Sequence, residues 1–292
     1  MSEKEIREIF GKININVKEI EKAGNSYNSN VYIVSDGSNK YILKISNNHK
    51  KRINESKYYN YLSKFVPTSK VLCSDQINNI EYNVLTFFEG KNIYDEDCNS
   101  LSSKQIFNIG KLLGDIHSCP IIDKDDDSWT IYLIDCLNKT QNELAKIFGK
   151  EDNDVIQNFL SEFISKKIKD NYKNCILHMD FRVGNIMIAN NNEVGIIDLE
   201  SMKNGEYVFD FVKMNRIFNE DNFNIFLDGY KSVKSIDADF DEKLKFYSFF
   251  DSYTSLYWCV SKNQTDLDFY KLNHSIAMKY LGLIKNGVWS IQ

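Results

Sequence analysis

Two aspartates and an asparagine occur at a spacing that can serve phosphoryl chemistry. Asp180 is followed five residues later by Asn185, and Asp198 comes thirteen residues after Asn185. Phosphoryl transfer needs a carboxylate near the acceptor hydroxyl and oxygen ligands for Mg²⁺. The ordinary alternative is that these residues only form turns, since Asp and Asn favour loops. Because strand patterns lie on both sides of them, we interpret the three residues as one site.

Three short segments around this set have the apolar pattern of strands: 174–177, 186–189 and 194–199. The run Asn190-Asn191-Asn192 supplies the turn between the last two. This pattern predicts that Asp180 and Asn185 lie on a loop held by strands. It also predicts that Asp198 lies on the final strand.

The N-terminal part of the chain predicts a small antiparallel sheet with a helix. Residues 31–34 and 41–45 alternate around a turn-forming run, and residues 70–73 and 81–88 form a second pair that turns at Asn78-Asn79. Residues 3–10 predict a short helix capped by Ser2 and Glu5. Residues 49–65 predict a longer helix with one apolar face, which is formed by Ile53, Tyr58, Tyr61, Leu62 and Phe65.

A lysine and a glutamate occur at informative places in these elements. Lys44 is centred on a predicted strand, where its ammonium group could serve as a point charge for phosphate oxygens. Glu55 shares a helix face with Tyr59 and Leu62, which makes it the expected partner of Lys44. The plainer alternatives are an edge-strand lysine that prevents aggregation and a solvated helix glutamate.

The segment 175–212 resembles the active site of the aminoglycoside phosphotransferase family, which shares its fold with eukaryotic-type protein kinases. The resemblance rests on the H-x-D-x-x-x-x-N run from His178 to Asn185 and on the strand ending in Ile197-Asp198-Leu199-Glu200. It also includes the turn from Gly205 to Asp210. The D-F-G and A-P-E signatures of protein kinases are not in the sequence, which favours a small-molecule kinase.

This resemblance implies a role for each matching residue. Asp180 would be the catalytic base or hydroxyl orienter, and Asn185 and Asp198 would be Mg²⁺ ligands. His178, counted with the catalytic residues, would brace the loop together with Asp210. The nucleotide phosphates would contact Lys44, which Glu55 holds in place, and Ser26 on the phosphate-covering loop. The nucleotide base would contact the backbone of the hinge residues Thr86, Phe87 and Phe88.

The acceptor side is predicted from charge and from the resemblance. The acidic balance and the resemblance favour a cationic, aminoglycoside-like acceptor, for which Glu200 and Asp251 are the candidate contacts. The acidic run 123–127 is either a solvated loop or part of that site. The aromatic residues between Phe246 and Trp258 recur at helical spacing, and we interpret them as core or pocket wall.

Composition excludes several other classes of function. The 292 residues include 36 Lys and Arg against 41 Asp and Glu, a net charge of −5, which argues against binding nucleic acid or an anionic membrane. The charged N-terminus and the lack of a long apolar run predict a cytoplasmic protein. The six cysteines are scattered, which fits reduced thiols better than a disulfide framework or a zinc site.

Together these observations predict an α+β, bilobal, protein-kinase-like fold. Residues 1–88 would form the nucleotide-binding lobe, and residues 89–292 a larger, mostly helical lobe. The expected activity is Mg²⁺-dependent transfer of the γ-phosphoryl group of ATP or GTP to a hydroxyl of a small molecule, with an aminoglycoside-type antibiotic as the leading acceptor and resistance as its consequence. Two alternatives stay open: a metabolic kinase for choline, thiamine or a sugar, and a non-catalytic nucleotide-binding relative. The expected oligomeric state is a monomer or weak dimer.

Overall fold

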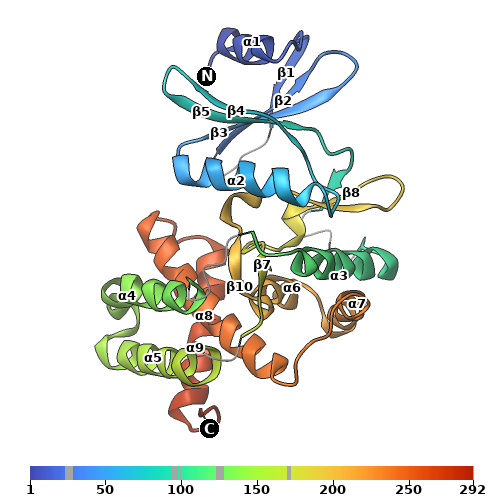
Figure 1. Cartoon of the computed structure of the whole chain (residues 1–292). Coiled ribbons are helices and arrows are strands. Elements are labelled where there is room, and N and C mark those ends of the chain that lie inside the picture. Colours follow the sequence, from blue (N-terminus) through green and yellow to red (C-terminus); the bar gives the residue numbers. More distant parts are fainter. Residues whose placement is uncertain (24–28, 94–97, 99, 123–127, 170–171, 292) are drawn as a thin grey trace. The chain divides into compact units, whose positions relative to one another are not determined.

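The chain forms two compact units, each assembled from several segments, in the computed structural model of Figure 1. Unit 1 contains Met1–Cys119, His178–Lys203 and Lys213–Ser235, and unit 2 contains Pro120–Leu177, Asn204–Val212 and Ile236–Gln292. The structure describes residues 1–23, 29–93, 98, 100–122, 128–169 and 172–291. Ser26 and the acidic run 123–127 therefore lie outside the described residues. The predicted division after residue 88 stays a prediction, because units defined by packing need not be separate binding lobes.

One antiparallel sheet carries Lys44 in unit 1. Its strands are β1 (Glu19–Lys22), β2 (Ser29–Ser35), β3 (Lys40–Ser46), β4 (Val71–Ile77) and β5 (Ile80–Thr86), in the order β1-β2-β3-β5-β4. Both predicted hairpins are present, and Asn78 and Asn79 have the positive φ that asparagine tolerates at a tight turn. Because β3 is paired on both sides, with β2 and with β5, the edge-strand alternative for Lys44 is wrong.

The first helix, α1 (Glu3–Lys12), covers part of this sheet. Its capping box is formed by Ser2 and Glu5, as predicted. Its buried side chains join sheet residues in one apolar cluster that includes Phe10, Leu43 and Val84. Burial of this kind supplies the main favourable free energy that holds a helix against a sheet.

The second helix, α2 (His49–Leu62), buries only part of the face that apolar spacing predicts. Ile53 and Phe65 are 47% and 52% exposed, so their place on a buried face is wrong, whereas Tyr58 and Leu62 are buried. The buried residues are Arg52, Glu55, Tyr58, Tyr59 and Leu62. Apolar spacing misses part of this face because two of its members, Arg52 and Glu55, are charged residues with polar partners, described below. Phe65 also lies beyond the end of the helix at Leu62.

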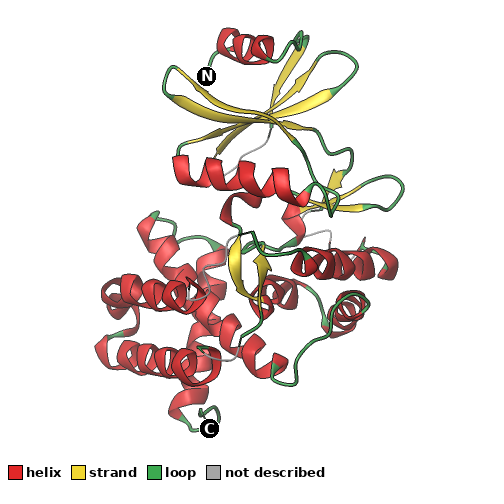
Figure 2. Cartoon of the chain, viewed as in Figure 1, coloured by secondary structure: helices red, strands yellow, loops and turns green. Residues whose placement is uncertain are grey.

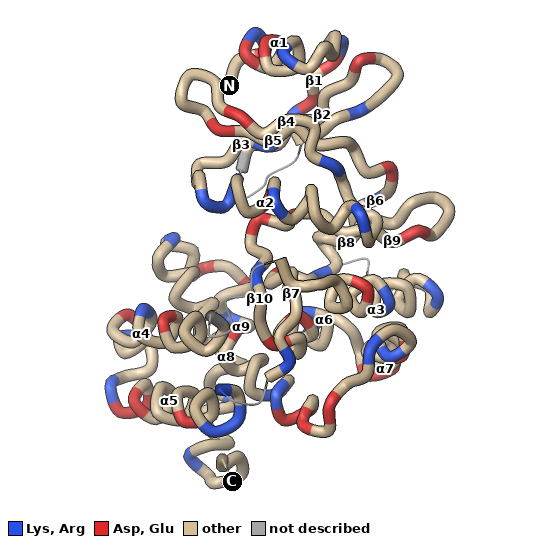
Figure 3. Tube along the Cα trace, in the orientation of Figure 1, with Lys and Arg blue, Asp and Glu red and all other residues tan. Residues whose placement is uncertain are grey.

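The rest of unit 1 contains the loop from His178 to Asn185 and the elements around it. A three-stranded sheet consists of β6 (Lys91–Asn92), β8 (Ile186–Ile188) and β9 (Val194–Ile196), in the order β6-β8-β9. Short 3₁₀ turns occupy Val183–Asn185 and Leu199–Ser201, and the helices are α3 (Ser103–Ser118), α6 (Val212–Ile217) and α7 (Glu220–Lys231). Figure 3 shows basic and acidic residues interspersed on α1, α3 and α7.

Helices α3 and α7 approach each other closely through a reciprocal pair of glycines. A Cβ atom added at Gly110 would lie 1.9 Å from the carbonyl oxygen of Phe226, and one added at Gly229 would lie 2.0 Å from that of Phe107. Neither position has room for a side chain. The two helices therefore pack backbone against backbone.

The described part of unit 2 is mostly helical, and Figure 2 colours its helices red. Its helices are α4 (Ser128–Phe148), α5 (Lys150–Phe163) with a π-helical turn at Ile164–Ile168, α8 (Phe240–Ser261) and α9 (Asp268–Lys285). Its remaining elements are the paired strands β7 (Asn174–Leu177) and β10 (Lys203–Glu206) and a 3₁₀ helix at Tyr207–Phe211. The predicted aromatic run lies on α8, where Phe246, Phe249 and Tyr253 are fully buried core residues.

None of the described helices is both long and apolar enough to cross a membrane.

Candidate active site

His178 is a buried strut between two loops. Its side chain is inaccessible to solvent, and Nε2 lies 3.0 Å from the carbonyl oxygen of Ile197. The backbone N–H of Asp180 donates to Nδ1 at 3.3 Å. The two contacts together require the ring proton to be on Nε2. His178 thus ties the loop of Asp180 to the residues just before Asp198, and Asp210, which belongs to unit 2, stays a predicted brace.

Asp180 is surrounded by positively charged and amide groups. Its Oδ2 accepts hydrogen bonds from Asn185 Nδ2 at 3.0 Å and from Arg182 Nε at 3.4 Å, and the Lys213 ammonium group contacts Oδ1. Burial alone would raise the pKa of Asp180, but the charges of Lys213 and Arg182 outweigh it and hold the pKa below its usual value. Asp180 is therefore ionised at neutral pH, as a group that orients a hydroxyl must be.

Asn185 and the residue before Asp198 are joined by a backbone hydrogen bond, in which the Ile197 N–H donates to the Asn185 carbonyl oxygen at 3.0 Å. The Asn185 amide nitrogen also donates to the Asp180 carbonyl oxygen at 2.9 Å. The prediction that Asp198 lies on a strand is wrong, because β9 ends at Ile196. Asp198 has φ 63° and ψ 62°, the left-handed region, and this conformation ends the pairing.

Lys44 is the centre of a buried charged cluster. Its ammonium nitrogen lies 2.7 Å from Glu55 Oε1, 2.6 Å from Asp198 Oδ1 and 3.1 Å from Glu200 Oε2. The expected contact between Lys44 and Glu55 is therefore present. Burial alone would lower the pKa of Lys44, but its three carboxylate partners outweigh burial and hold the pKa well above its usual value. Burial also raises the pKa of Glu55, in spite of the nearby ammonium group.

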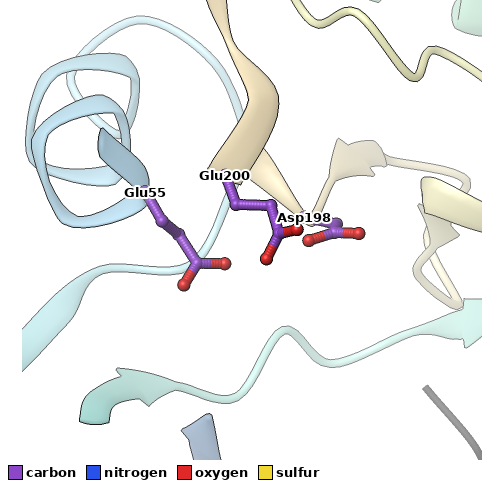
Figure 4. Close-up of side chains that lie close together, drawn as sticks. All are labelled: Glu55, Asp198 and Glu200. Atoms are coloured by element: carbon purple, nitrogen blue, oxygen red, sulfur yellow. The ribbon is translucent and has the colours of Figure 1, made fainter. Parts of the chain in front are cut away.

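The three carboxylates of this cluster converge in Figure 4, and their oxygens lie within 4.8 Å of one another. This geometry would suit a metal ion, but the Lys44 ammonium group already lies among them. Mg²⁺ would instead meet Asn185 Oδ1 and Asp198 Oδ2, which accept no hydrogen bond within the described residues. Two oxygen ligands with places left for water and phosphate are what Mg²⁺ prefers, so the residues fit this ion.

Glu200 contacts two lysines, and its predicted contact with an acceptor stays a prediction. One carboxylate oxygen contacts Lys44 and the other contacts the Lys51 ammonium group at 2.7 Å, and the residue is 8% exposed. Its geometry therefore places it in the charged cluster. Asp251, the other predicted substrate contact, lies on α8 in unit 2, and its proximity to the acceptor stays a prediction.

The predicted hinge is fixed by the sheet and by β9. Thr86 exchanges backbone and side-chain hydrogen bonds with the Lys70 backbone, each at 2.8 Å. The Phe87 N–H donates to the Lys40 carbonyl oxygen at 3.4 Å. The Phe88 ring lies over Gly195, where an added Cβ atom would be 2.4 Å from it. That these residues read a nucleotide base stays a prediction.

Several site residues could not be found from local patterns. Lys213 contacts Asp180 from α6, and Lys51 contacts Glu200 from α2. Asn83 lies opposite Lys44 in the sheet and donates to Glu55 Oε2 at 2.9 Å. Only Arg182, which lies within the quoted motif, could have been included from the sequence.

The residues of this site lie within the range that one protein-family profile matches. The profile of the phosphotransferase enzyme family matches residues 19–242, a range that includes Lys44, Asp180 and Asp198. The chain belongs to the phosphotransferase enzyme family. The predicted resemblance is thereby confirmed at the level of the family. No curated protein sequence matches the chain.

Solved structures of other phosphotransferases resemble this one. The GDP complex of a mutant aminoglycoside 2'-phosphotransferase-IIIa is 12% identical with a TM-score of 0.71, over 97% of this chain and 95% of that chain. The streptomycin–ATP–APH(2")-IIa ternary complex is 19% identical with a TM-score of 0.66, over 97% and 98%. The choline kinase LicA from Streptococcus pneumoniae is 15% identical with a TM-score of 0.71, over 96% and 98%. At such low sequence identities the structural similarity shows the fold alone, and it confirms the predicted kinase-like fold.

Proposed function

We propose that this phosphotransferase transfers the γ-phosphoryl group of ATP or GTP to a hydroxyl group of a small molecule. The observation that carries the proposal is the arrangement in unit 1 of Asp180 beside Asn185, and of Lys44 beside Glu55 and Asp198. Each of these groups has a task in phosphoryl transfer. Similar structures that are complexes with GDP or ATP support a nucleotide donor.

In this proposal the chain's residues orient the two reactants. Asp180 accepts a hydrogen bond from the acceptor hydroxyl and takes its proton as the new bond to phosphorus forms. Because the pKa of Asp180 is held below its usual value, the proton moves late, when the hydroxyl oxygen is already partly bonded. Asn185 holds the carboxylate in place, and Lys44 places positive charge beside the nucleotide phosphates.

Asn185 and Asp198 would hold Mg²⁺ through their outward oxygens. When bound, the ion neutralises negative charge on the phosphates. Glu55 keeps the Lys44 ammonium group in place through the 2.7 Å contact.

We propose an aminoglycoside-type molecule as the leading acceptor, with choline as the second candidate. Structures with a similar fold include complexes of streptomycin and gentamicin and a choline kinase. The acidic balance of the chain is compatible with a cationic acceptor of either kind. A cytoplasmic location and a monomer or weak dimer complete the proposal.

The test is nucleotide consumption with Mg²⁺ over a panel of acceptors, comparing the native protein with Asp180→Asn. The acceptors are aminoglycosides, choline, thiamine and sugars, each with ATP and GTP. We expect acceptor-dependent turnover that falls by about 10²–10⁴-fold in Asp180→Asn, while nucleotide affinity is retained. The matched control is Asp221→Asn, an exposed residue in the first turn of α7, which should leave turnover unchanged.

Each outcome of this assay decides between the candidates. Turnover only on choline, thiamine or a sugar would replace the aminoglycoside and keep the mechanism. Near-normal turnover in Asp180→Asn would contradict the role of Asp180. Nucleotide binding without turnover on any acceptor would favour the non-catalytic relative.

A further inference from the structure

Residues 197–202, which we name the Asp198 segment, are held from two sides. On one side Ile197 is held by the loop formed by residues 178–185. The Asn185 carbonyl oxygen accepts the Ile197 N–H at 3.0 Å, and His178 Nε2 lies 3.0 Å from the Ile197 carbonyl oxygen. The remaining polar backbone atoms of the segment must be held by something else.

Helix α2 supplies the other side. Asn54 Nδ2 donates to the carbonyl oxygens of Glu200 at 3.1 Å and Met202 at 2.9 Å. The Tyr59 hydroxyl accepts the Asp198 N–H at 3.0 Å. Lys51, Glu55 and Tyr59 are spaced four residues apart, so all three project from one face of the helix. That face contacts the segment at Glu200, reaches Lys44, and contacts the segment again at Asp198.

The contact with Tyr59 falls at the residue whose backbone needs support. Asp198 has φ 63°, and apart from asparagines the only other non-glycine residue with positive φ in the described chain is Met179. A side chain in this region costs about 1–2 kcal/mol relative to ordinary backbone. The conformation persists only where surrounding groups favour it. The Tyr59 hydroxyl, on a residue that is 2% exposed, is such a group because it satisfies the Asp198 N–H away from water.

We propose that Tyr59 is a positioning residue, and that its hydroxyl holds Asp198 in the left-handed conformation that directs the Asp198 carboxylate toward Lys44 and the predicted metal position. The proposal rests on the proposed function for its catalytic meaning. The conformational part concerns this chain alone. Helix α2 thus holds Lys44 through Glu55 and Asp198 through Tyr59.

The test replaces the hydroxyl and nothing else, in Tyr59→Phe. The matched control is Tyr82→Phe, which removes the hydroxyl of a fully buried tyrosine in the sheet core of the same unit. Two quantities are measured: the exchange rate of the Asp198 amide hydrogen in the ligand-free protein, and the affinity for Mn²⁺ in the presence of a non-hydrolysable ATP analogue. Thermal unfolding confirms that each variant is folded.

We expect Tyr59→Phe to accelerate exchange of the Asp198 amide and to weaken Mn²⁺ binding by roughly tenfold, the effect of one lost hydrogen bond to a buried donor. Tyr82→Phe should change neither quantity. If exchange and Mn²⁺ affinity in Tyr59→Phe both match those of the control, the proposal is wrong. If the native protein binds no nucleotide or metal, the proposed function fails, and the exchange rate alone still decides whether Tyr59 holds Asp198.

Discussion

In unit 1 the buried side chains between β3 and α2 are charged or polar, whereas in unit 2 the buried side chains around α8 are mostly aromatic. Lys44, Arg52, Glu55 and Asn83 are each 8% exposed or less. Arg52 contacts Glu81 at 2.8 Å and Ser74 at 2.6 Å, and Ser74 donates to Asn83, which in turn donates to Glu55. One continuous network thus runs from the far strand of the sheet to Asp198.

Unit 2 contains Trp129 at the centre of its aromatic packing. The indole nitrogen donates to the Tyr247 hydroxyl at 2.9 Å, and the ring packs against Tyr132 and Phe209 with centroids 5.4 Å apart in each case. A Cβ atom added at Gly205 would lie 2.4 Å from the indole ring. Burying apolar rings stabilises the unit, whereas burying charge costs free energy unless it is paired.

This difference indicates where a ligand is expected. The charged cluster of unit 1 is paired inwardly, yet Asp198 still has an oxygen that accepts nothing within the described residues. Unit 2 also buries an ion pair, Lys243 with Glu206 at 3.1 Å, and Glu206 Oε1 has no hydrogen-bond partner within the described residues, but the Glu206 side chain is inaccessible to solvent, whereas that of Asp198 is 39% exposed. A ligand from solvent can therefore reach the charged cluster at Asp198, and charged groups with shifted pKa values are common at functional sites.

The largest expected effect is that of Lys44→Met, which removes the cation from the cluster. We expect turnover to fall by about 10³-fold or more, because charge beside the phosphates is lost. The three carboxylates then have only Lys51, which contacts Glu200, to offset their charge, so Mg²⁺ alone should raise the unfolding temperature of the variant but not of the native protein. The measurements are the coupled assay and thermal unfolding with and without Mg²⁺. In the double variant Lys44→Met/Glu55→Gln the effect of Mg²⁺ should shrink, and its persistence would contradict this explanation.

Trp129→Ala should separate stability from nucleotide binding. We expect a loss of about 3–5 kcal/mol in the free energy of unfolding, because a large buried aromatic side chain leaves a cavity. Urea unfolding measures this loss. Nucleotide affinity of the folded fraction should stay close to native, since the proposed nucleotide contacts are in unit 1. If Trp129→Ala lost nucleotide affinity but not stability, the assignment of stability to unit 2 and of nucleotide binding to unit 1 would be wrong.

Glu206→Gln should change how stability depends on pH. Burial raises the pKa of Glu206 to about 7, although Lys243 opposes the shift. A raised pKa means that this carboxyl's stabilising effect is complete below pH 4.5, its unfolded value, and is lost as the pH rises through 7. The loss is at most about 3.5 kcal/mol, from 1.4 kcal/mol per pH unit between 4.5 and about 7.

Urea unfolding of native protein and Glu206→Gln at pH 5 and pH 8 tests this expectation. The native protein should lose more stability than the variant between the two values. Lys243 keeps Asp239 as a partner at 3.1 Å in the variant, so its charge is not left alone. Parallel changes in the two proteins would show that Glu206 does not titrate in this range.

Local patterns predicted the parts of the molecule that local interactions determine. The capping box of α1, the Asn78-Asn79 turn and the spacing from Asp180 to Asn185 all depend on residues close in sequence. The partnership of Glu55 with Lys44 was predicted from the helix face that Glu55 shares with Tyr59 and Leu62, whereas apolar spacing placed the exposed residues Ile53 and Phe65 on a buried face because it does not register buried charged residues such as Arg52. Lys213 and Tyr59 could not be predicted, since each contacts its aspartate across a long stretch of chain.

The backbone contact between α3 and α7 has a consequence for how the chain acquires its fold during synthesis. About a hundred residues separate the end of α3 at Ser118 from the start of α7 at Glu220. At ordinary rates of translation these residues take on the order of ten seconds to appear. For that time the surface of α3 around Gly110 has no covering helix, and the nascent unit 1 cannot close. Chaperones that bind apolar helices would find α3 exposed throughout this interval.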